Sequence, residues 1–152
     1  MPILRVYLDN CCYNRPYDDQ TQQRIWDEAQ AKILIQSKIK NNELELVSSF
    51  VLEYECSRSR YDVQRNYIQS FLEDNTSIYI DSSYDSKVKK IAEEIMKTGV
   101  KRLDAYHTAC AIIADCDYFV TTDDRLLKYI DERISIVTPD EFVRIEGGAK
   151  NA

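Results

Sequence analysis

The sequence predicts an α/β fold in which helices cover both faces of a parallel sheet. Short β-rich runs are spread along the chain, namely ILRVYL (3–8), LELVSS (44–49), SIYI (77–80), DYFV (117–120) and ISIV (134–137). Segments with helical spacing of apolar residues separate these runs. Strands that alternate with helices favour parallel pairing, because each helix returns the chain to the starting edge of the sheet.

A single domain is expected from the length of 152 residues, since domains usually contain about 100–200 residues. No repeat, low-complexity block or linker interrupts residues 1–146. Two of the three glycines, Gly147 and Gly148, open the last segment, GGAKNA. We therefore predict one domain over residues 1–146 and a flexible tail at 147–152.

The helices follow from apolar spacing, taken in chain order. Residues 20–40 keep Ile25, Ala29 and Ile33 on one face, and residues 61–72 continue with a similar pattern. A third helix is expected after Ser82, in a segment rich in capping residues. The last, over residues 103–113, is rich in alanine and can pack closely against the sheet.

Composition excludes several classes of protein. The net charge of −6 and a pI of about 4.9 argue against general affinity for nucleic acid, so any such role must use a local patch or metal ions. The longest apolar runs are too short to cross a bilayer, and Arg5 interrupts the only early candidate for a signal peptide. We expect a cytoplasmic protein with no membrane contact.

The five cysteines form no Cys-x-x-Cys pair, and the chain contains one histidine. Cys11 and Cys12 are adjacent and therefore point in different directions, which makes a shared tetrahedral zinc ion improbable. We expect reduced thiols.

Acidic residues follow two of the predicted strands directly. Asp9 follows the first strand and Asp123 the fourth, while Glu53 and Asp104 lie at helix starts. In parallel α/β folds, ligands bind beyond the carboxyl ends of the strands. Clustered carboxylates repel one another, and hard divalent cations such as Mg²⁺ or Mn²⁺ relieve that repulsion while preferring oxygen ligands. A metal site for a phosphodiester substrate is therefore the interpretation that we favour.

The ordered pattern LDN…VLEYE…RLDAYHTACA…TTDDRLL resembles PIN-domain nucleases, including the toxin subunits of bacterial toxin–antitoxin pairs. The resemblance covers about residues 3–143. It implies a three-layer α/β/α sandwich with strand order 3-2-1-4-5 and a Mg²⁺- or Mn²⁺-dependent endoribonuclease. It also implies RNA as substrate, a possible cognate antitoxin and a possible homodimer. The residues that match the family's metal-binding acids are Asp9, Glu53, Asp104 and Asp123, and Thr122 matches a small residue that orients a metal ligand.

The sequence departs from the family pattern at Cys11 and Cys12, and again in the segment YNRPYDDQTQQ (13–23). The family more often carries Ser, Thr or apolar residues after LDN.

Several positions keep an alternative. Glu53 competes with Glu55, because residues two apart on a helix face opposite ways and only one can point inward; we favour Glu53. Asp123 competes with Asp124, and we favour Asp123 as the ligand and Asp124 as a helix cap. Asp9 has the alternative of capping the next helix, a task that Asn10 can also perform.

His107 lies one helical turn beyond Asp104, on the same face. It can form a hydrogen bond with a ligand carboxylate or touch substrate, and it can equally be a structural histidine.

Two alternative functions for the protein also remain. One is an RNA- or protein-binding module without turnover; the other is an aspartyl-phosphate phosphatase, which Cys11 disfavours because it occupies the position of that family's second Asp.

Overall fold

The computed structural model describes the backbone of residues 3–151 and the side chains of residues 3–147. Its sheet has five strands in the order β3-β2-β1-β4-β5, and every pairing between them is parallel. The predicted fold class and strand order are confirmed. The strands are β1 (Leu4–Leu8), β2 (Leu44–Ser49), β3 (Thr76–Ile80), β4 (Tyr118–Val120) and β5 (Ser135–Val137).

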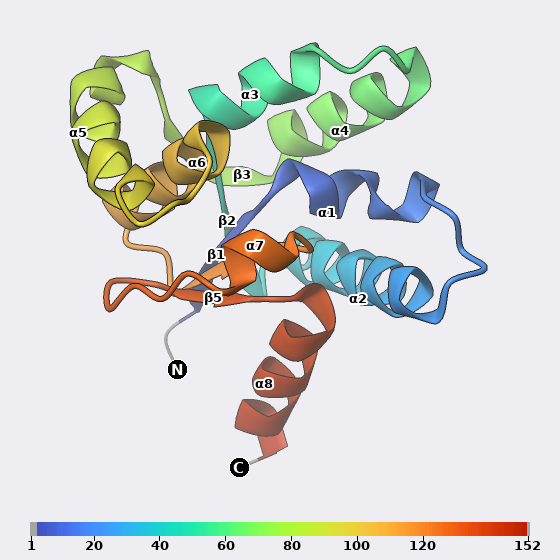
Figure 1. Ribbon diagram of the computed structural model, residues 1–152. Helices are drawn as coiled ribbons and strands as arrows, with labels where there is room; N and C mark the ends of the chain where they lie inside the picture. The colour runs from blue at the N-terminus through green and yellow to red at the C-terminus, as the bar shows by residue number, and fades with distance from the viewer. Residues whose placement is uncertain (1–2, 152) are drawn as a thin grey trace.

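Helices connect and cover these strands (Figure 1). They are α1 (Asn10–Asn14), η1 (Arg15–Tyr17), α2 (Gln23–Lys40), α3 (Phe50–Ser57), α4 (Asp62–Asn75), η2 (Ser82–Tyr84), α5 (Asp85–Met96), α6 (Arg102–Ile113), α7 (Asp124–Leu127) and α8 (Pro139–Asn151). Helix α8 continues through most of the segment 147–152 that we predicted as a tail, and Ala152 lies outside the described residues.

The helices divide between two sides of the sheet, as right-handed crossovers require. Helix α2 packs against α8 on one side, and α5 packs against α6 on the other (Figure 1). Helix α3 follows β2 without a loop and contacts both α4 and α6. The chain therefore has the three layers expected of the fold.

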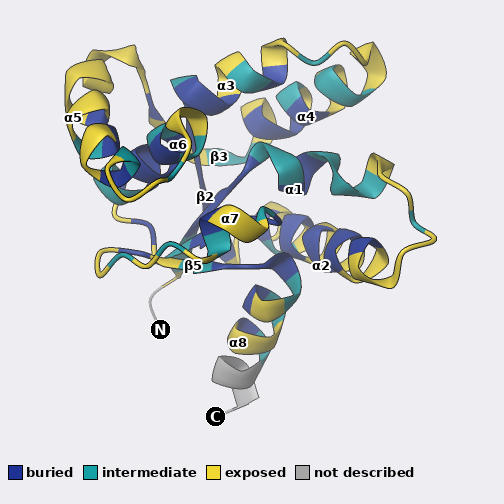
Figure 2. Cartoon of the chain, in the orientation of Figure 1, coloured by how far each residue is buried: buried dark blue, intermediate teal, exposed yellow. Residues whose placement is uncertain are grey.

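The core is formed by the central strands and the inner faces of the helices (Figure 2). Val6, Tyr7 and Leu8 of β1 are fully buried, as a strand covered on both faces must be. The Tyr7 ring stacks on Phe119 of β4 with ring centroids 5.3 Å apart. Ala105 and Ala109 let α6 approach the sheet closely, because both are buried and small.

The register between β1 and β4 decides where the chain places its acids. Leu8 pairs with Val120, and the amide of Asp9 donates to the carbonyl of Val120 at 2.9 Å. The residues that follow the two strands therefore leave the sheet side by side. The crossovers that follow β1 and precede β4 lie on opposite faces, so this is the point where ligands bind in such sheets.

Among the described residues, none of the helices combines the length and apolar character needed to cross a lipid bilayer. The five cysteines are unpaired thiols, and all except the half-buried Cys11 are buried.

Candidate active site

Asp9 is a buried carboxylate whose orientation is fixed on both sides. One oxygen accepts from the amide of Asn10 at 2.8 Å, which caps α1. The other accepts from the hydroxyl of Thr121 at 2.9 Å and from the thiol of Cys11 at 3.4 Å. Burial raises the pKa of Asp9 above its ordinary value, and the neighbouring His107 offsets part of that effect.

His107 joins α6 to α3 and to the sheet through a buried hydrogen-bonded chain. Its Nε2 lies 2.9 Å from a carboxylate oxygen of Glu55, and its Nδ1 lies 2.7 Å from the hydroxyl of Tyr7. That hydroxyl is in turn 2.7 Å from Oγ of Ser49. Burial lowers the pKa of His107, but the bond to Glu55 and the charge of Asp9 outweigh it, so the pKa is raised overall.

The acids converge at the carboxyl ends of β1 and β4. Asp9, Glu55 and His107 each offer one ligand atom within 4.8 Å of the others. Asp104 is half-buried beside them: burial and the charges of Asp9 and Asp123 raise the pKa of Asp104 to about 6. Burial is the larger cause of this shift, and the contributions of Asp9 and Asp123 show that the three carboxylates act on one another.

Asp123 contributes to this cluster while it caps a helix. One of its oxygens accepts from the amides of Arg125 at 2.8 Å and Leu126 at 3.2 Å, which starts α7. Asp124 instead pairs with Arg24 of α2 at 2.7 Å. Our assignment of the helix cap to Asp124 is therefore wrong: Asp123 is the cap, and Asp124 forms an ion pair between helices. The ligand role of Asp123 stays a prediction.

Glu53 lies away from this cluster, and Glu55 takes the place that we assigned to it. Glu53 is exposed and accepts from the hydroxyl of Tyr79 on β3. The apolar residues of α3 carry a signal that our choice did not use. Val51, Leu52 and Cys56 are its buried residues, and position 55 lies one turn from the first two.

Thr121, rather than Thr122, orients the carboxylate of Asp9. Thr122 contributes its amide to Cys11 Sγ at 3.4 Å and its carbonyl to Arg24 at 2.9 Å. Thr121 Oγ1 donates to Asp9 and accepts from the amide of Asp123 at 3.1 Å. It thereby links the two strand-end acids, a role that sequence alone could not assign to one of two adjacent threonines.

The donor set suits a hard divalent cation. Carboxylate oxygens dominate it, and Mg²⁺ and Mn²⁺ prefer oxygen ligands. Both nitrogens of His107 are already engaged by Glu55 and Tyr7, so the imidazole supports a ligand more readily than it becomes one. The acids Asp9, Glu55, Asp104 and Asp123 fit such an ion, with Asn10 adjoining them at the start of α1.

Comparison with known proteins places the fold. No protein-family model and no curated protein matches the sequence. A chain of VapBC2 from Rickettsia felis, bound to a DNA fragment from their promoter, matches with a TM-score of 0.53 at 15% identity, over 88% of this chain and 97% of that one. The chain shares the fold of that protein.

Two further structures agree. FitAcB from Neisseria gonorrhoeae gives a TM-score of 0.51 at 16% identity, over 88% of this chain and 97% of that one. FitAB bound to an IR36 DNA fragment gives 0.55 at 16% identity, with 88% and 94% covered. At such identities the similarity establishes the fold, and function has to be argued from the site.

Proposed function

We propose that the protein is a PIN-type endoribonuclease that depends on Mg²⁺ or Mn²⁺. The observation that carries the proposal is the convergence of Asp9, Glu55, Asp104 and Asp123 where β1 and β4 end, with a raised pKa at Asp104. A divalent cation held there would supply Lewis-acid activation of water and neutralise charge that develops on a phosphodiester.

The residues of the chain position the acids. Thr121 fixes Asp9, and His107 fixes Glu55 through Nε2. Tyr7 holds the other nitrogen of the same ring, and Ser49 holds Tyr7. These contacts keep the carboxylates close despite their repulsion, and such supporting contacts contribute strongly to metal affinity.

We further propose a role as the toxin of a toxin–antitoxin pair, with a small antitoxin as partner. The support is the sequence resemblance together with the fold shared with VapBC2 and FitAB, whose structures are two-component complexes. A homodimer remains a prediction from the same resemblance.

The test compares two glutamates on one helix. Glu55→Gln should lower Mn²⁺-dependent cleavage of RNA at least about 100-fold, as loss of a ligand or of its orientation does. The matched control is Glu53→Gln, which removes the same charge two residues away and should stay within about threefold of native activity. Cleavage that Glu53→Gln abolishes and Glu55→Gln preserves would refute this ligand set. RNA binding by the native protein without cleavage would favour the binding module instead.

A further inference from the structure

A cavity of about 400 Å³ opens directly beside the acid cluster. Its walls come from the loop 98–101 between α5 and α6, from Asp104, and from residues 125–130 on and after α7. Asp104 is therefore shared between the cavity and the cluster. A molecule bound at the acid cluster can therefore extend past Asp104 into this cavity.

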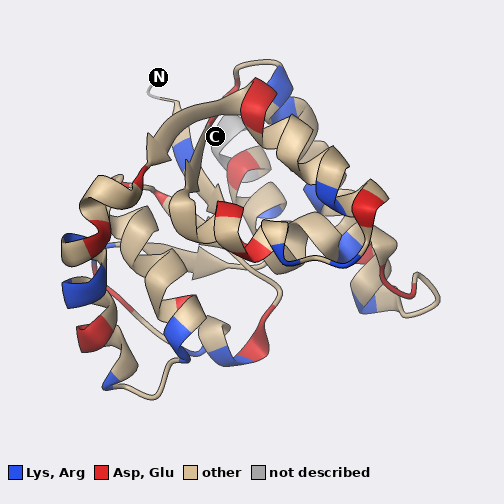
Figure 3. Ribbon diagram, turned by 90° about the horizontal axis from the view of Figure 1, so that it is seen from above, with Lys and Arg blue, Asp and Glu red and all other residues tan. Residues whose placement is uncertain are grey.

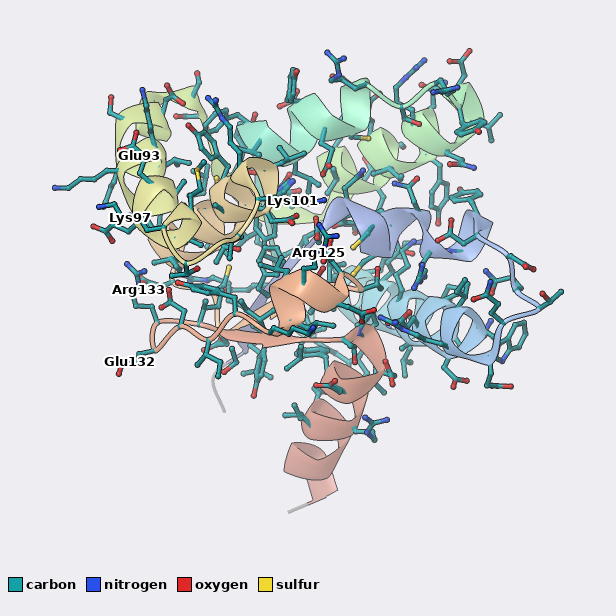
Figure 4. The ribbon with its side chains drawn as sticks, in the orientation of Figure 1. Glu93, Lys97, Lys101, Arg125, Glu132 and Arg133 are labelled. Carbon is teal, nitrogen blue, oxygen red and sulfur yellow. The ribbon has the colours of Figure 1, made fainter. Side chains whose placement is uncertain are left out.

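Basic side chains line the cavity. Lys101, Arg125 and Lys128 are all exposed. Figure 4 shows Lys101, just before α6, and Arg125, on α7, extending into the same region. Lys101 also precedes the first turn of α6, which has no side-chain cap, so the partial positive charge of that helix end adds to theirs.

The two central cations are not used by the fold. Within the described residues, Lys101 and Arg125 form no ion pair and no side-chain hydrogen bond. Other arginines do: Arg24 pairs with Asp124, and Arg133 pairs with Asp131. Because Lys101 and Arg125 line the same cavity and have no carboxylate partner of their own in the described part of the chain, both are available to bind an anion there.

Acidic and basic residues are interspersed on the side of the molecule that Figure 3 shows. With a net charge of −6, the protein has no general attraction for nucleic acid. Positive charge that draws RNA toward the acids must therefore be local.

We propose that this cavity binds a backbone phosphate of the RNA next to the phosphodiester presented to the acid cluster, with Lys101 and Arg125 as its ligands. The inference rests on the proposed ribonuclease function and deepens it. The guanidinium of Arg125 can form bidentate hydrogen bonds with two phosphate oxygens, and the ammonium of Lys101 adds a positive charge on a flexible side chain. Gly99, at φ +102°, turns the loop, and a Cβ built there would meet nothing within 4 Å, so this wall leaves room for the ligand.

Binding is measured separately from cleavage, in an Asp9→Asn background that leaves the RNA intact. The probe is a fluorescent single-stranded RNA of about 12 nucleotides, followed by anisotropy over a range of KCl concentrations. Lys101→Gln and Arg125→Gln should each weaken binding about fivefold and reduce the slope of log K against log[KCl] by about 0.7. The matched control is Lys97→Gln, because Lys97 is exposed just after α5 and is not among the residues that line the cavity; binding should change less than about twofold.

The same substitutions are then made with Asp9 present. The KM for RNA should rise about fivefold while kcat stays within about twofold, because the lost contact binds substrate and transition state alike. Equal effects of Lys97→Gln and Lys101→Gln would overturn the phosphate site even if cleavage persists. Specific weakening at Lys101 and Arg125 in a protein that never cleaves RNA would support the site and refute the nuclease. Absence of RNA binding by the Asp9→Asn protein would overturn the phosphate site.

Discussion

The carboxylate of Asp9 caps α1 through one oxygen and accepts from Thr121 through the other. Both alternatives that the sequence left open for Asp9 are thus compatible: it caps a helix and it faces the acid cluster. Asp123 likewise caps a helix, α7, and belongs to the acid cluster. Capping contacts use one oxygen of each carboxylate and fix its direction, so the site is ordered by the backbone on which it sits.

The two adjacent threonines give a test at this scale. Thr121→Val removes the hydroxyl that bonds Asp9, with little change of shape, and should lower metal-dependent cleavage about 10–100-fold. Thr122→Val is the matched control, because the contacts of Thr122 come from its backbone. Its activity should remain within about threefold of native. The measurement is the steady-state cleavage rate of each variant. An inactive Thr122→Val protein together with an active Thr121→Val protein would contradict the role of Thr121 in orienting Asp9.

Helix α3 is the element that connects the sheet to the site. Ser49 ends β2, caps α3 by accepting from the amide of Leu52 at 3.1 Å, and bonds Tyr7. The start of the helix is thereby fixed relative to β1. Because a helix advances about 100° per residue, fixing its start also fixes which glutamate faces inward. Glu55 rather than Glu53 reaches His107 for this reason.

Ser49→Ala should therefore destabilise the protein by about 2 kcal/mol, since it removes a helix cap and leaves the buried hydroxyl of Tyr7 short of a partner. The neighbouring Ser48 is also buried, but its hydroxyl makes no hydrogen bond within the described residues. Ser48→Ala should change the free energy of unfolding by less than about 0.5 kcal/mol. Urea unfolding measures both, and equal losses would show that α3 does not depend on this cap.

The fold brings Asp9, Glu55, Asp104 and Asp123 together, and their mutual repulsion lowers the stability of the folded protein. A bound cation would remove this repulsion. At pH 8 Asp104 is ionised, although its pKa in the folded protein is about 6 and the ordinary pKa of an aspartate is 3.8. Folding thus opposes its ionised form, and the penalty is complete above the folded pKa and fades as the pH falls toward the lower value. A bound cation favours the folded state over the unfolded one.

Mn²⁺ at about 100 times its Kd should stabilise the native protein by about 2.7 kcal/mol, or roughly 5–10 °C in Tm for a domain of this size. Asp9→Asn should lose most of this shift. Without metal at pH 8, Asp104→Asn should be more stable than the native protein by about 1 kcal/mol, after allowing for solvent screening of a half-exposed group, and the gain should shrink at pH 4.

Thermal melting with NaCl at equal ionic strength as the control measures these effects. A native Tm that Mn²⁺ leaves unchanged would contradict the metal site. A metal-free Asp104→Asn protein less stable than native at pH 8 would show that the acids do not repel one another.

The sequence by itself determined the α/β class, the parallel sheet and the approximate strands, because alternating β-rich and helical segments are local patterns that each segment carries within itself. With the family resemblance, it also indicated the strand order and placed Asp9, Asp104 and Asp123 at strand ends or helix starts. Only the tertiary structure decided between Glu53 and Glu55, between Thr121 and Thr122, and between the roles of Asp123 and Asp124. Each of these choices depends on the rotation of a helix or strand end about its axis. That rotation is fixed by contacts between residues far apart in the chain, such as Tyr7 with His107 and Arg24 with Asp124.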